Sequence, residues 1–356
     1  MTHRERILTA MRREQPDRMS FVLSMTPPIM AEFSRRTGSS DLVSFYDFDE
    51  RGVGPGATPH PADFSAYYRD RSFSGPVQID PTWGFATVAV DEGTHFRHFE
   101  SPFDGRDFTV ADALAYPIPD MDNPARYTRV SAANAGWHGK GYATRYVSGF
   151  CTYDLSWLIR GYEAFLMDLA MDTEASAVLM DRVSGAVAAE LRHMAGRGTD
   201  IVGVGEDVGG QTGLVMSPDL WRAQIKPRLA HIIRSAKSAN PEVLFFYHSD
   251  GNIEVIIEDL IDIGVDILNP VQPECMDPAV IKKRHGDRLA FWGGVGTQTT
   301  MPFGSPDEVR SCVHHLFETV GKGGGFLCAP SHTLEPEVPW ENIVAFVEAC
   351  RECVYP

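Results

Sequence analysis

Imidazole, thiol and carboxylate side chains follow several short apolar stretches of this 356-residue chain, at the points where buried strands would end. These groups are the usual zinc donors in proteins, and a catalytic zinc keeps one coordination position open for substrate. His248 and Asp250 share one turn, and Cys328 would arrive from a later strand. The pattern predicts a centre for zinc or another divalent metal held by His248, Asp250 and Cys328, with Glu206 or Asp207 in the fourth position.

Each of these residues also has an ordinary structural interpretation. His248 alone fits a hydrogen-bonded strand-end residue, Asp250 before Gly251 is typical of a turn, and Cys328 alone behaves as a small buried hydrophobe. Their placement at successive strand ends favours the functional interpretation, and we predict catalytic roles for Glu206, Asp207, His248 and Asp250. Substrate contacts are predicted for six further side chains at or near strand ends: Gln211, Tyr247, Asn269, Gln272, Gln298 and His332.

The segment 244–273 indicates which elements position these groups. An apolar strand over 244–247 ends at the polar turn 248–252, and apolar residues then recur at helical spacing over 253–263. Gly264 ends that helix, and 265–268 forms the next buried strand. Parallel α/β folds bind ligands at the carboxyl ends of such strands, which is where the polar residues stand.

The same alternation covers most of the chain. Strands are predicted at 19–23, 143–150, 201–205, 244–247, 265–268, 289–292 and 326–327. Helices are predicted at 4–13, 29–36, 153–171, 174–196, 217–239, 253–263, 280–285, 309–320 and 340–353. Repeated strand–helix units with polar residues at the strand ends predict an α/β fold of the (β/α)8 TIM-barrel type.

Residues 40–140 are less regular and rich in proline, glycine and aromatic residues. Alternation over 87–99 predicts a β-hairpin that turns at 91–93. We interpret 40–140 as barrel elements with a long elaboration, and an independent small β domain is the alternative.

Composition excludes several classes of partner. The net charge of −16 disfavours nucleic acid and anionic membrane surfaces. No basic-then-apolar amino terminus and no long apolar run is present, so neither a signal peptide nor a membrane span is expected. Six scattered cysteines indicate free thiols in a reducing cytoplasm. Cys350 and Cys353 form a CxxC pair, but no second pair accompanies it to complete a metal site.

Several segments are similar to the uroporphyrinogen decarboxylase superfamily, in particular to its methyltransferase branch. They are ERILTAMRREQPDR (5–18), LSWLIRGYEAFLMDLA (155–170), GEDVGGQTGLVMSPDLW (205–221), YHSDGNI (247–253), GVDILNPVQP (264–273), FWGGVGTQ (291–298) and GGGFLCAPSHTLEPEVPWENI (323–343). The resemblance covers most of the chain outside 40–140. It implies a single barrel domain over 1–356 with its site at the carboxyl-terminal mouth.

The resemblance implies two candidate activities, decarboxylation and methyl transfer. The decarboxylases carry a motif of the form FxRQAGR after the first strand, whereas this chain has SMTPPIM (24–30), without an arginine. A substrate with four carboxylates would be poorly paired there, so porphyrinogen decarboxylation is not expected. The methyltransferases carry HxC and a later cysteine as zinc ligands. His248 and Cys328 match that pattern, and Asp250 replaces the middle cysteine.

We therefore expect transfer of a methyl group from a small methylated substrate to a corrinoid. No DxHxxG corrinoid-binding motif occurs in the chain, so a partner protein would carry the corrinoid. The chain is also compatible with a homodimer. Two alternatives stay open: a metal-free decarboxylase of a small carboxylic acid, with Asp250 or Glu206 as proton donor, and a non-catalytic ligand-binding protein.

Overall fold

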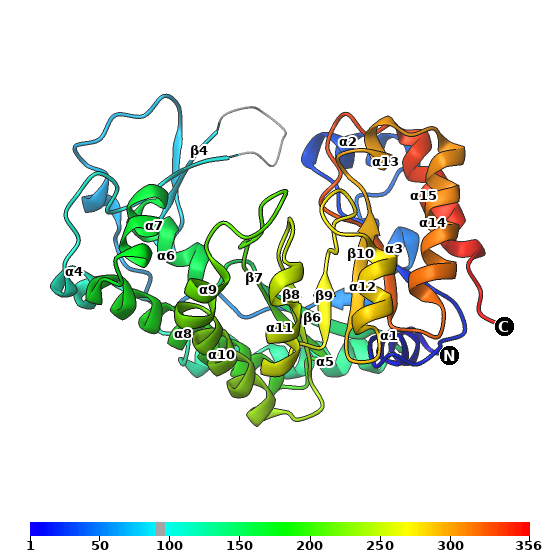
Figure 1. Ribbon diagram of the computed structural model, residues 1–356, viewed down its shortest axis with the longest axis horizontal. Helices are drawn as coiled ribbons and strands as arrows, with labels where there is room; N and C mark the ends of the chain where they lie inside the picture. The colour runs from blue at the N-terminus through cyan, green and yellow to red at the C-terminus, as the bar shows by residue number, and fades with distance from the viewer. Residues whose placement is uncertain (90–96) are drawn as a thin grey trace.

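Eight parallel strands curl into a (β/α)8 barrel in the computed structural model, which describes residues 1–89 and 97–356 (Figure 1). Neighbouring strands follow the order β1-β11-β10-β9-β8-β7-β6-β2. The strands are β1 (Ser20–Phe21), β2 (Glu50–Gly52), β6 (Ala143–Ser148), β7 (Ile201–Gly205), β8 (Leu244–His248), β9 (Ile267–Asn269), β10 (Ala290–Val295) and β11 (Phe326–Pro330). The predicted fold class is confirmed.

Helices cover the outside of this sheet. The longer ones are α1 (His3–Met11), α2 (Pro27–Thr37), α5 (Val130–His138), α6 (Thr152–Arg160), α7 (Tyr162–Ala170), α8 (Glu174–Ala195), α10 (Lys226–Ala239), α12 (Pro278–His285), α14 (Pro306–Leu316) and α15 (Trp340–Glu352). Shorter helices are α3 (Leu42–Tyr46), α4 (Val110–Ala115), α9 (Pro218–Gln224), α11 (Ile257–Ile263) and α13 (Thr300–Phe303). Single turns are η1 (Ser65–Tyr67), η2 (Pro124–Tyr127), η3 (Glu254–Ile256) and η4 (Phe317–Gly321).

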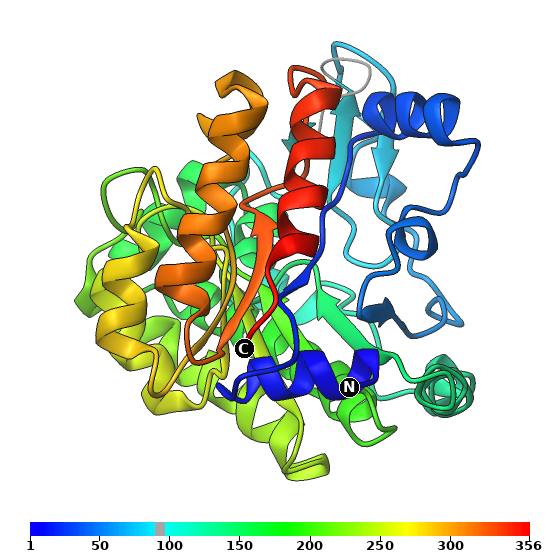
Figure 2. The same ribbon diagram turned by 90° about the vertical axis from the view of Figure 1, so that its right-hand side faces the viewer.

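The helix α1 closes the amino-terminal end of the barrel. Its Ile7 and Met11 belong to the buried cluster formed by the inward-facing strand residues. The Arg4 guanidinium holds the helix in place through an ion pair of 2.6 Å with Asp200, the residue before β7. Figure 2 shows this helix lying across the base of the molecule. The opposite, carboxyl-terminal end is therefore the end that can admit ligands.

Alternation along each strand decides which side chains enter the barrel. On β8, Leu244 and Phe246 face the interior cluster, whereas Phe245 and Tyr247 pack in the core beneath the helices. Because the period of a strand is two residues, His248 and Asp250 continue the inward series. The same count applies to β11, where Leu327 faces inward.

The elaboration contains a three-stranded antiparallel sheet of β3 (Val77–Ile79), β4 (Ala86–Ala89) and β5 (Arg97–Glu100). The pairing of β4 with β5 confirms the predicted hairpin, although its turn at 91–93 lies outside the described residues. Phe64, Phe103 and Tyr116 share the main buried cluster with the barrel helices. Packing of this kind supports an elaboration of the barrel, and the single-domain organisation stays a prediction.

Two predicted helices are interrupted in the structure. The segment 153–171 divides into α6 and α7 at Gly161, whose φ of 101° is outside the helical region. The segment 217–239 divides into α9 and α10 just before Pro227, which lacks the N–H that an unbroken helix would need. Among the described residues, none of the helices has the length and apolar character needed to cross a membrane.

Candidate functional site

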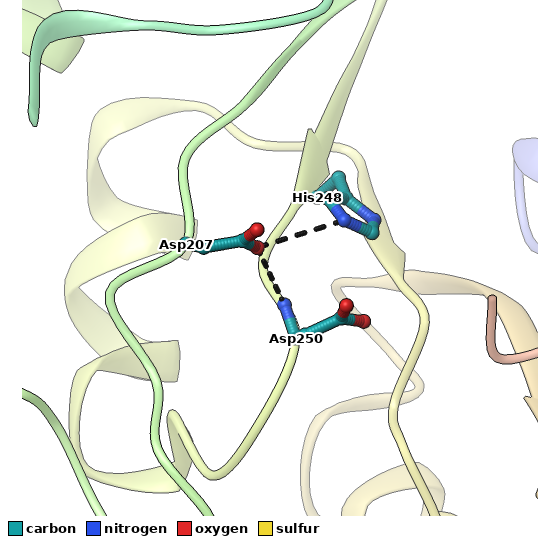
Figure 3. Close-up of side chains that lie close together, drawn as sticks. All are labelled: Asp207, His248 and Asp250. Carbon is teal, nitrogen blue, oxygen red and sulfur yellow. Dashed lines mark hydrogen bonds and ion pairs between the residues drawn. The ribbon is translucent and has the colours of Figure 1, made fainter. Parts of the chain in front are cut away.

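Three side chains from two neighbouring strand ends converge at the mouth of the barrel. Asp207 follows β7, His248 ends β8, and Asp250 lies two residues further on. Their nearest nitrogen and oxygen atoms all lie within 4.8 Å of one another, close enough to share one metal ion. Figure 3 shows the Asp207 carboxylate between the His248 ring and the Asp250 backbone nitrogen. The His248 Nε2–Asp207 Oδ1 distance is 3.6 Å, and the Asp250 N–H donates to Asp207 Oδ1 at 2.9 Å.

The next strand fixes the orientation of the His248 ring. Asn269, the last residue of β9, donates its side-chain N–H to the Trp292 carbonyl at 2.6 Å. Its Oδ1 therefore faces His248 Nδ1, at 2.5 Å. Because that amide oxygen can only accept, Nδ1 carries the proton, and Nε2 is left to face Asp207 and Asp250. An outer hydrogen bond of this type orients metal-binding histidines.

Burial and charge shift both titrating groups on this turn. Burial disfavours the imidazolium, but the carboxylates of Asp250 and Asp207 outweigh it and raise the pKa of His248 above its ordinary value. Burial also raises the pKa of Asp250, against the opposing influence of His248 and His332. The turn can therefore hold a proton under conditions in which an exposed aspartate would be ionised.

A second carboxylate lies behind Asp207. Asp154, in the first turn of α6, accepts hydrogen bonds from the Asp207 backbone N–H at 3.0 Å and from the Trp157 indole at 3.1 Å. Burial, followed by the charge of Asp207, raises the pKa of Asp154 to about 7. The sequence interpretation missed Asp154 because the residue stands inside a predicted helix. An acidic residue in the first turn of the helix that follows a barrel strand was the available signal.

The loops that carry the two mouth aspartates touch through their backbones. Gly251 has a φ of +79°, and a Cβ there would lie 2.6 Å from the Gly209 carbonyl group. The Asn252 N–H donates to the Gly210 carbonyl at 2.7 Å, and the Val208 N–H donates to Ser249 Oγ at 3.2 Å. Only glycine permits this close approach. The loops after β7 and β8 therefore form one packed unit.

Two cavities adjoin this unit. The inner cavity, of about 490 Å³, reaches into the barrel and is bordered by His248 and Asn269. The outer cavity, of about 440 Å³, is bordered by Asp250. Both cavities share the stretch 331–333 after β11, so His332 lies on the boundary between them. Four residues predicted to bind substrate line the outer cavity: Gln211, Gln272, Gln298 and His332.

The structure does not bring Cys328 to the metal cluster, so its predicted role as a ligand beside His248 is wrong. Cys328 is fully buried and packs in the core beneath the helices, in contact with Cys350 of α15. Its neighbours Leu327 and Ala329 are the inward-facing residues of β11. The prediction ended this strand at 327, but the strand continues to Pro330. The residue that reaches the mouth from β11 is therefore His332.

Glu206 and Tyr247 also face away from the mouth. Glu206 is fully buried, and its Oε1 accepts the Tyr153 backbone N–H at 2.9 Å. Burial raises the pKa of Glu206 to about 8. Tyr247 is fully buried beside it and lines neither cavity. By strand alternation, Glu206 cannot join Asp207 on the inner face, so its predicted role as a metal ligand is wrong. Because Tyr247 reaches neither cavity, its predicted contact with substrate is wrong as well.

Residues 154–353 match the family model described as uroporphyrinogen decarboxylase. The chain belongs to the uroporphyrinogen decarboxylase family. A uroporphyrinogen decarboxylase of Pseudomonas fluorescens is 26% identical over 278 residues, which cover 74% of each chain. The methylcobamide:CoM methyltransferase MtaA of Methanosarcina barkeri is 27% identical over 198 residues, which cover 56% of this chain and 52% of that protein. The family therefore includes relatives of both predicted chemistries.

The fold comparison agrees with this family. A solved methyltransferase from Methanosarcina mazei superposes with a TM-score of 0.67 at 18% sequence identity, covering 99% of each chain. At that identity the match supports the barrel fold and says nothing of substrate. The uroporphyrinogen decarboxylase family is a family of enzymes, and its methyltransferase members make methyl transfer one of its activities.

Proposed function

We propose that this protein is a metal-dependent methyltransferase that moves a methyl group from a small methylated substrate to a corrinoid carried by a partner protein. The observation that carries the proposal is the convergence of Asp207, His248 and Asp250 at the barrel mouth, between two cavities. The relative described as a methylcobamide:CoM methyltransferase supports it. A corrinoid partner agrees with the lack of a DxHxxG motif in this chain.

The donor set fits a divalent metal. His248 Nε2 is oriented by Asn269, and Asp250 and Asp207 supply carboxylate oxygens within reach. His332, in the stretch after β11, borders both cavities and opposes the rise in the pKa of Asp250, so we propose it as a further ligand beside the three-residue cluster. Nitrogen and oxygen donors without a thiolate suit zinc and also harder divalent metals. A bound metal would act as a Lewis acid that polarises the heteroatom bearing the methyl group.

The protein side chains would perform the positioning. Asn269 keeps the proton of His248 on Nδ1, and Asp154 holds the Asp207 backbone in place. The inner cavity suits the small substrate, since it leads from His248 into a closed barrel. The outer cavity would receive the methyl acceptor. Its rim includes Phe303, which is 77% exposed and offers an apolar contact to a partner protein.

The inner cavity argues against a porphyrinogen. Residues 24–30 contain no arginine, and Ser24, Met25 and Met30 of this stretch line the cavity. Among the described residues that border it, Arg145 supplies the guanidinium, and Glu50 already neutralises that charge. Four substrate carboxylates would lack partners there.

Metal content and methyl transfer test the proposal together. Protein purified without chelator should contain close to one divalent metal per chain, measured by elemental analysis. His248→Ala should lose the metal and the methylation of cob(I)alamin by methyl donors that the parent accepts. A parent protein free of transition metal, or a His248→Ala variant with parental metal content, would contradict the proposal.

The raised pKa of Asp250 favours a second candidate, a metal-free decarboxylase. Burial raises the pKa of the Asp250 carboxyl, and a carboxylic acid that holds its proton more firmly can deliver it to the carbanion left by a departing carboxylate. Carbon dioxide release from a small carboxylic acid by chelator-treated protein, abolished in Asp250→Asn, would favour this candidate over methyl transfer.

A further inference from the structure

A charged pair lies in the inner cavity, apart from the metal cluster. Arg145 of β6 and Glu50 of β2 both border this cavity, as His248 does. The Arg145 Nη2–Glu50 Oε1 distance is 3.1 Å. The two strands are hydrogen-bonded neighbours, so the pair is built by adjacent inward-facing positions of the barrel wall. Neither residue belongs to the set that holds the metal.

Aromatic rings hold the guanidinium in one orientation. The Arg145 Cζ lies 5.6 Å from the centre of the Phe246 ring and 5.0 Å from that of Trp292. These two rings are themselves in edge-to-face contact, with centroids 5.5 Å apart. Cation–π contacts of this kind restrict the arginine side chain, whose donors lie at the edge of the guanidinium plane. The donors are therefore preorganised before a ligand enters.

The guanidinium retains unused hydrogen-bonding capacity. Among the described residues, Glu50 is its hydrogen-bond partner, through one nitrogen, and the Arg145 side chain is 29% exposed. The chain contains a comparison pair of similar length, Arg126–Glu190 at 3.0 Å, whose side chains are 6% and 4% exposed. Arg126 has further contacts to Thr58 and Met121. Arg126 is thus a buried structural arginine that borders neither cavity, whereas Arg145 borders the inner cavity and makes a hydrogen bond through one nitrogen.

Charge and polarity select the ligand that would use these donors. The pair has no net charge, because the Glu50 carboxylate offsets the guanidinium, so a ligand carboxylate would meet Glu50 as well as Arg145. Much of the surrounding wall is apolar and includes Leu23, Met25 and Phe48. A neutral oxygen can accept from Arg145 without that repulsion.

We propose that Arg145 and Glu50 form a specificity subsite for a neutral oxygen, a hydroxyl or carbonyl, at the end of the substrate remote from the metal. The proposal rests on the function proposed above for the identity of the reacting end. The substrate class is a small, largely apolar molecule with a methylated heteroatom at one end and a neutral oxygen acceptor at the other.

Direct binding tests the subsite without metal or corrinoid. The probes are 4-methoxyphenol, 4-methoxytoluene and 4-methoxybenzoate, which differ in one substituent, and calorimetry on chelator-treated protein gives the affinities. The phenol should bind about tenfold more tightly than the toluene, the value of one hydrogen bond to a charged group, and more tightly than the benzoate. The double variant Glu50→Gln/Arg145→Met leaves no unpaired charge and should remove the preference for the phenol.

The matched control is Arg126→Met/Glu190→Gln, which removes a similar pair outside both cavities and should keep the preference. Circular dichroism of each variant separates loss of the subsite from loss of the fold, and Arg145→Lys serves if the double variant fails to fold. The Arg145→Lys variant should weaken the phenol preference, since an ammonium lacks the planar fork of donors of a guanidinium. Equal affinity of the parent for phenol and toluene, tightest binding of the benzoate, or an unchanged preference in the Arg145 variants would overturn the proposal.

The two proposals fail in different ways. If the protein binds no metal but prefers the phenol in an Arg145-dependent manner, the subsite proposal stands and the methyltransferase proposal fails. If the protein binds metal and transfers methyl groups but shows no Arg145-dependent preference, the methyltransferase proposal stands and the subsite proposal fails.

Discussion

Asn269 fixes the proton of His248, because its Oδ1 lies 2.5 Å from Nδ1 while its amide nitrogen donates to the Trp292 carbonyl. The amide cannot rotate without breaking both bonds. The remaining ring nitrogen, Nε2, is therefore the one that faces the mouth aspartates. One residue of β9 thus sets the chemistry available at the end of β8.

Removal of this amide should weaken metal binding. We expect Asn269→Ala to lower the affinity for zinc by about 10- to 100-fold, because the His248 ring loses its orientation and its preferred tautomer. Competition with a chromogenic chelator measures the affinity. Asn134→Ala is the control, since Asn134 also donates to a backbone carbonyl, at 2.9 Å, but lies outside both cavities. Equal affinity of both variants and the parent would show that Asn269 does not position a ligand.

Metal content should depend on His332 and be independent of Cys328. Cys328→Ser changes a thiol in the core beneath the helices, so its metal stoichiometry should equal that of the parent. His332→Ala removes the proposed ligand at the boundary of the cavities and should lose most of the metal after identical dialysis. Elemental analysis of the two variants decides between the residues. Loss of metal from Cys328→Ser, with a native circular dichroism spectrum, would restore the thiolate ligand.

Metal affinity should fall as the pH falls. A metal binds the neutral imidazole and must displace the proton from Nε2 of His248. The pKa of His248 is raised by Asp250 and Asp207, so proton competition should begin above the ordinary histidine range around pH 6.5. Zinc dissociation constants measured at several pH values should show this onset. An affinity that is constant from about pH 5.5 to about pH 8 would exclude histidine ligation.

Glu206→Gln should stabilise the fold at high pH. The pKa of Glu206 is about 8 in the folded protein against an ordinary 4.5, so between these values only the unfolded chain releases the proton. The parent therefore loses stability as pH rises through this window. A glutamine still accepts the Tyr153 N–H and does not titrate, so the variant has no such loss of stability with pH. Relative to the parent, the variant should gain roughly 1–3 kcal/mol in unfolding free energy between about pH 5 and about pH 8.5. Denaturant titrations measure this difference, and the exposed Glu163→Gln should show no such gain.

Uroporphyrinogen should not be a substrate. The stretch 24–30 lines the inner cavity without an arginine, and Arg145 is already paired with Glu50. Chromatography of a reaction with uroporphyrinogen under reducing conditions should show no coproporphyrinogen above the uncatalysed background. Formation of coproporphyrinogen at an enzymatic rate would require a different set of carboxylate-binding residues from those described.

The barrel and the convergence of Asp207, His248 and Asp250 at its mouth could be predicted from the sequence. Apolar runs followed by His248-x-Asp250 and by Asp207 mark strand ends, and strand ends in a barrel meet at one mouth. The strands themselves could be recognised as short, nearly continuous apolar runs, because strands of a parallel barrel are buried on both faces. These predictions needed only local pattern and the rule that parallel strands share a carboxyl edge.

The local sequence pattern did not predict where β11 ends. Pro330 ends β11 three residues after the predicted boundary, and that difference moves Cys328 from the mouth to the middle of the strand. A shift of one residue reverses the face on which a side chain lies, which is why Glu206 and Asp207 separate to opposite sides. The Arg145–Glu50 pair depends on contact between strands far apart in sequence, and no spacing within one segment reveals it.

The contact between Gly209 and Gly251 also limits how this barrel can be redesigned. The loops after β7 and β8 meet backbone to backbone. One loop transferred alone from a relative would therefore not fit against the loop that remains. Chimeras that exchange both loops as a single cassette should retain the mouth geometry, and single-loop chimeras should not. The unit of variation at the barrel mouth is therefore the pair of loops.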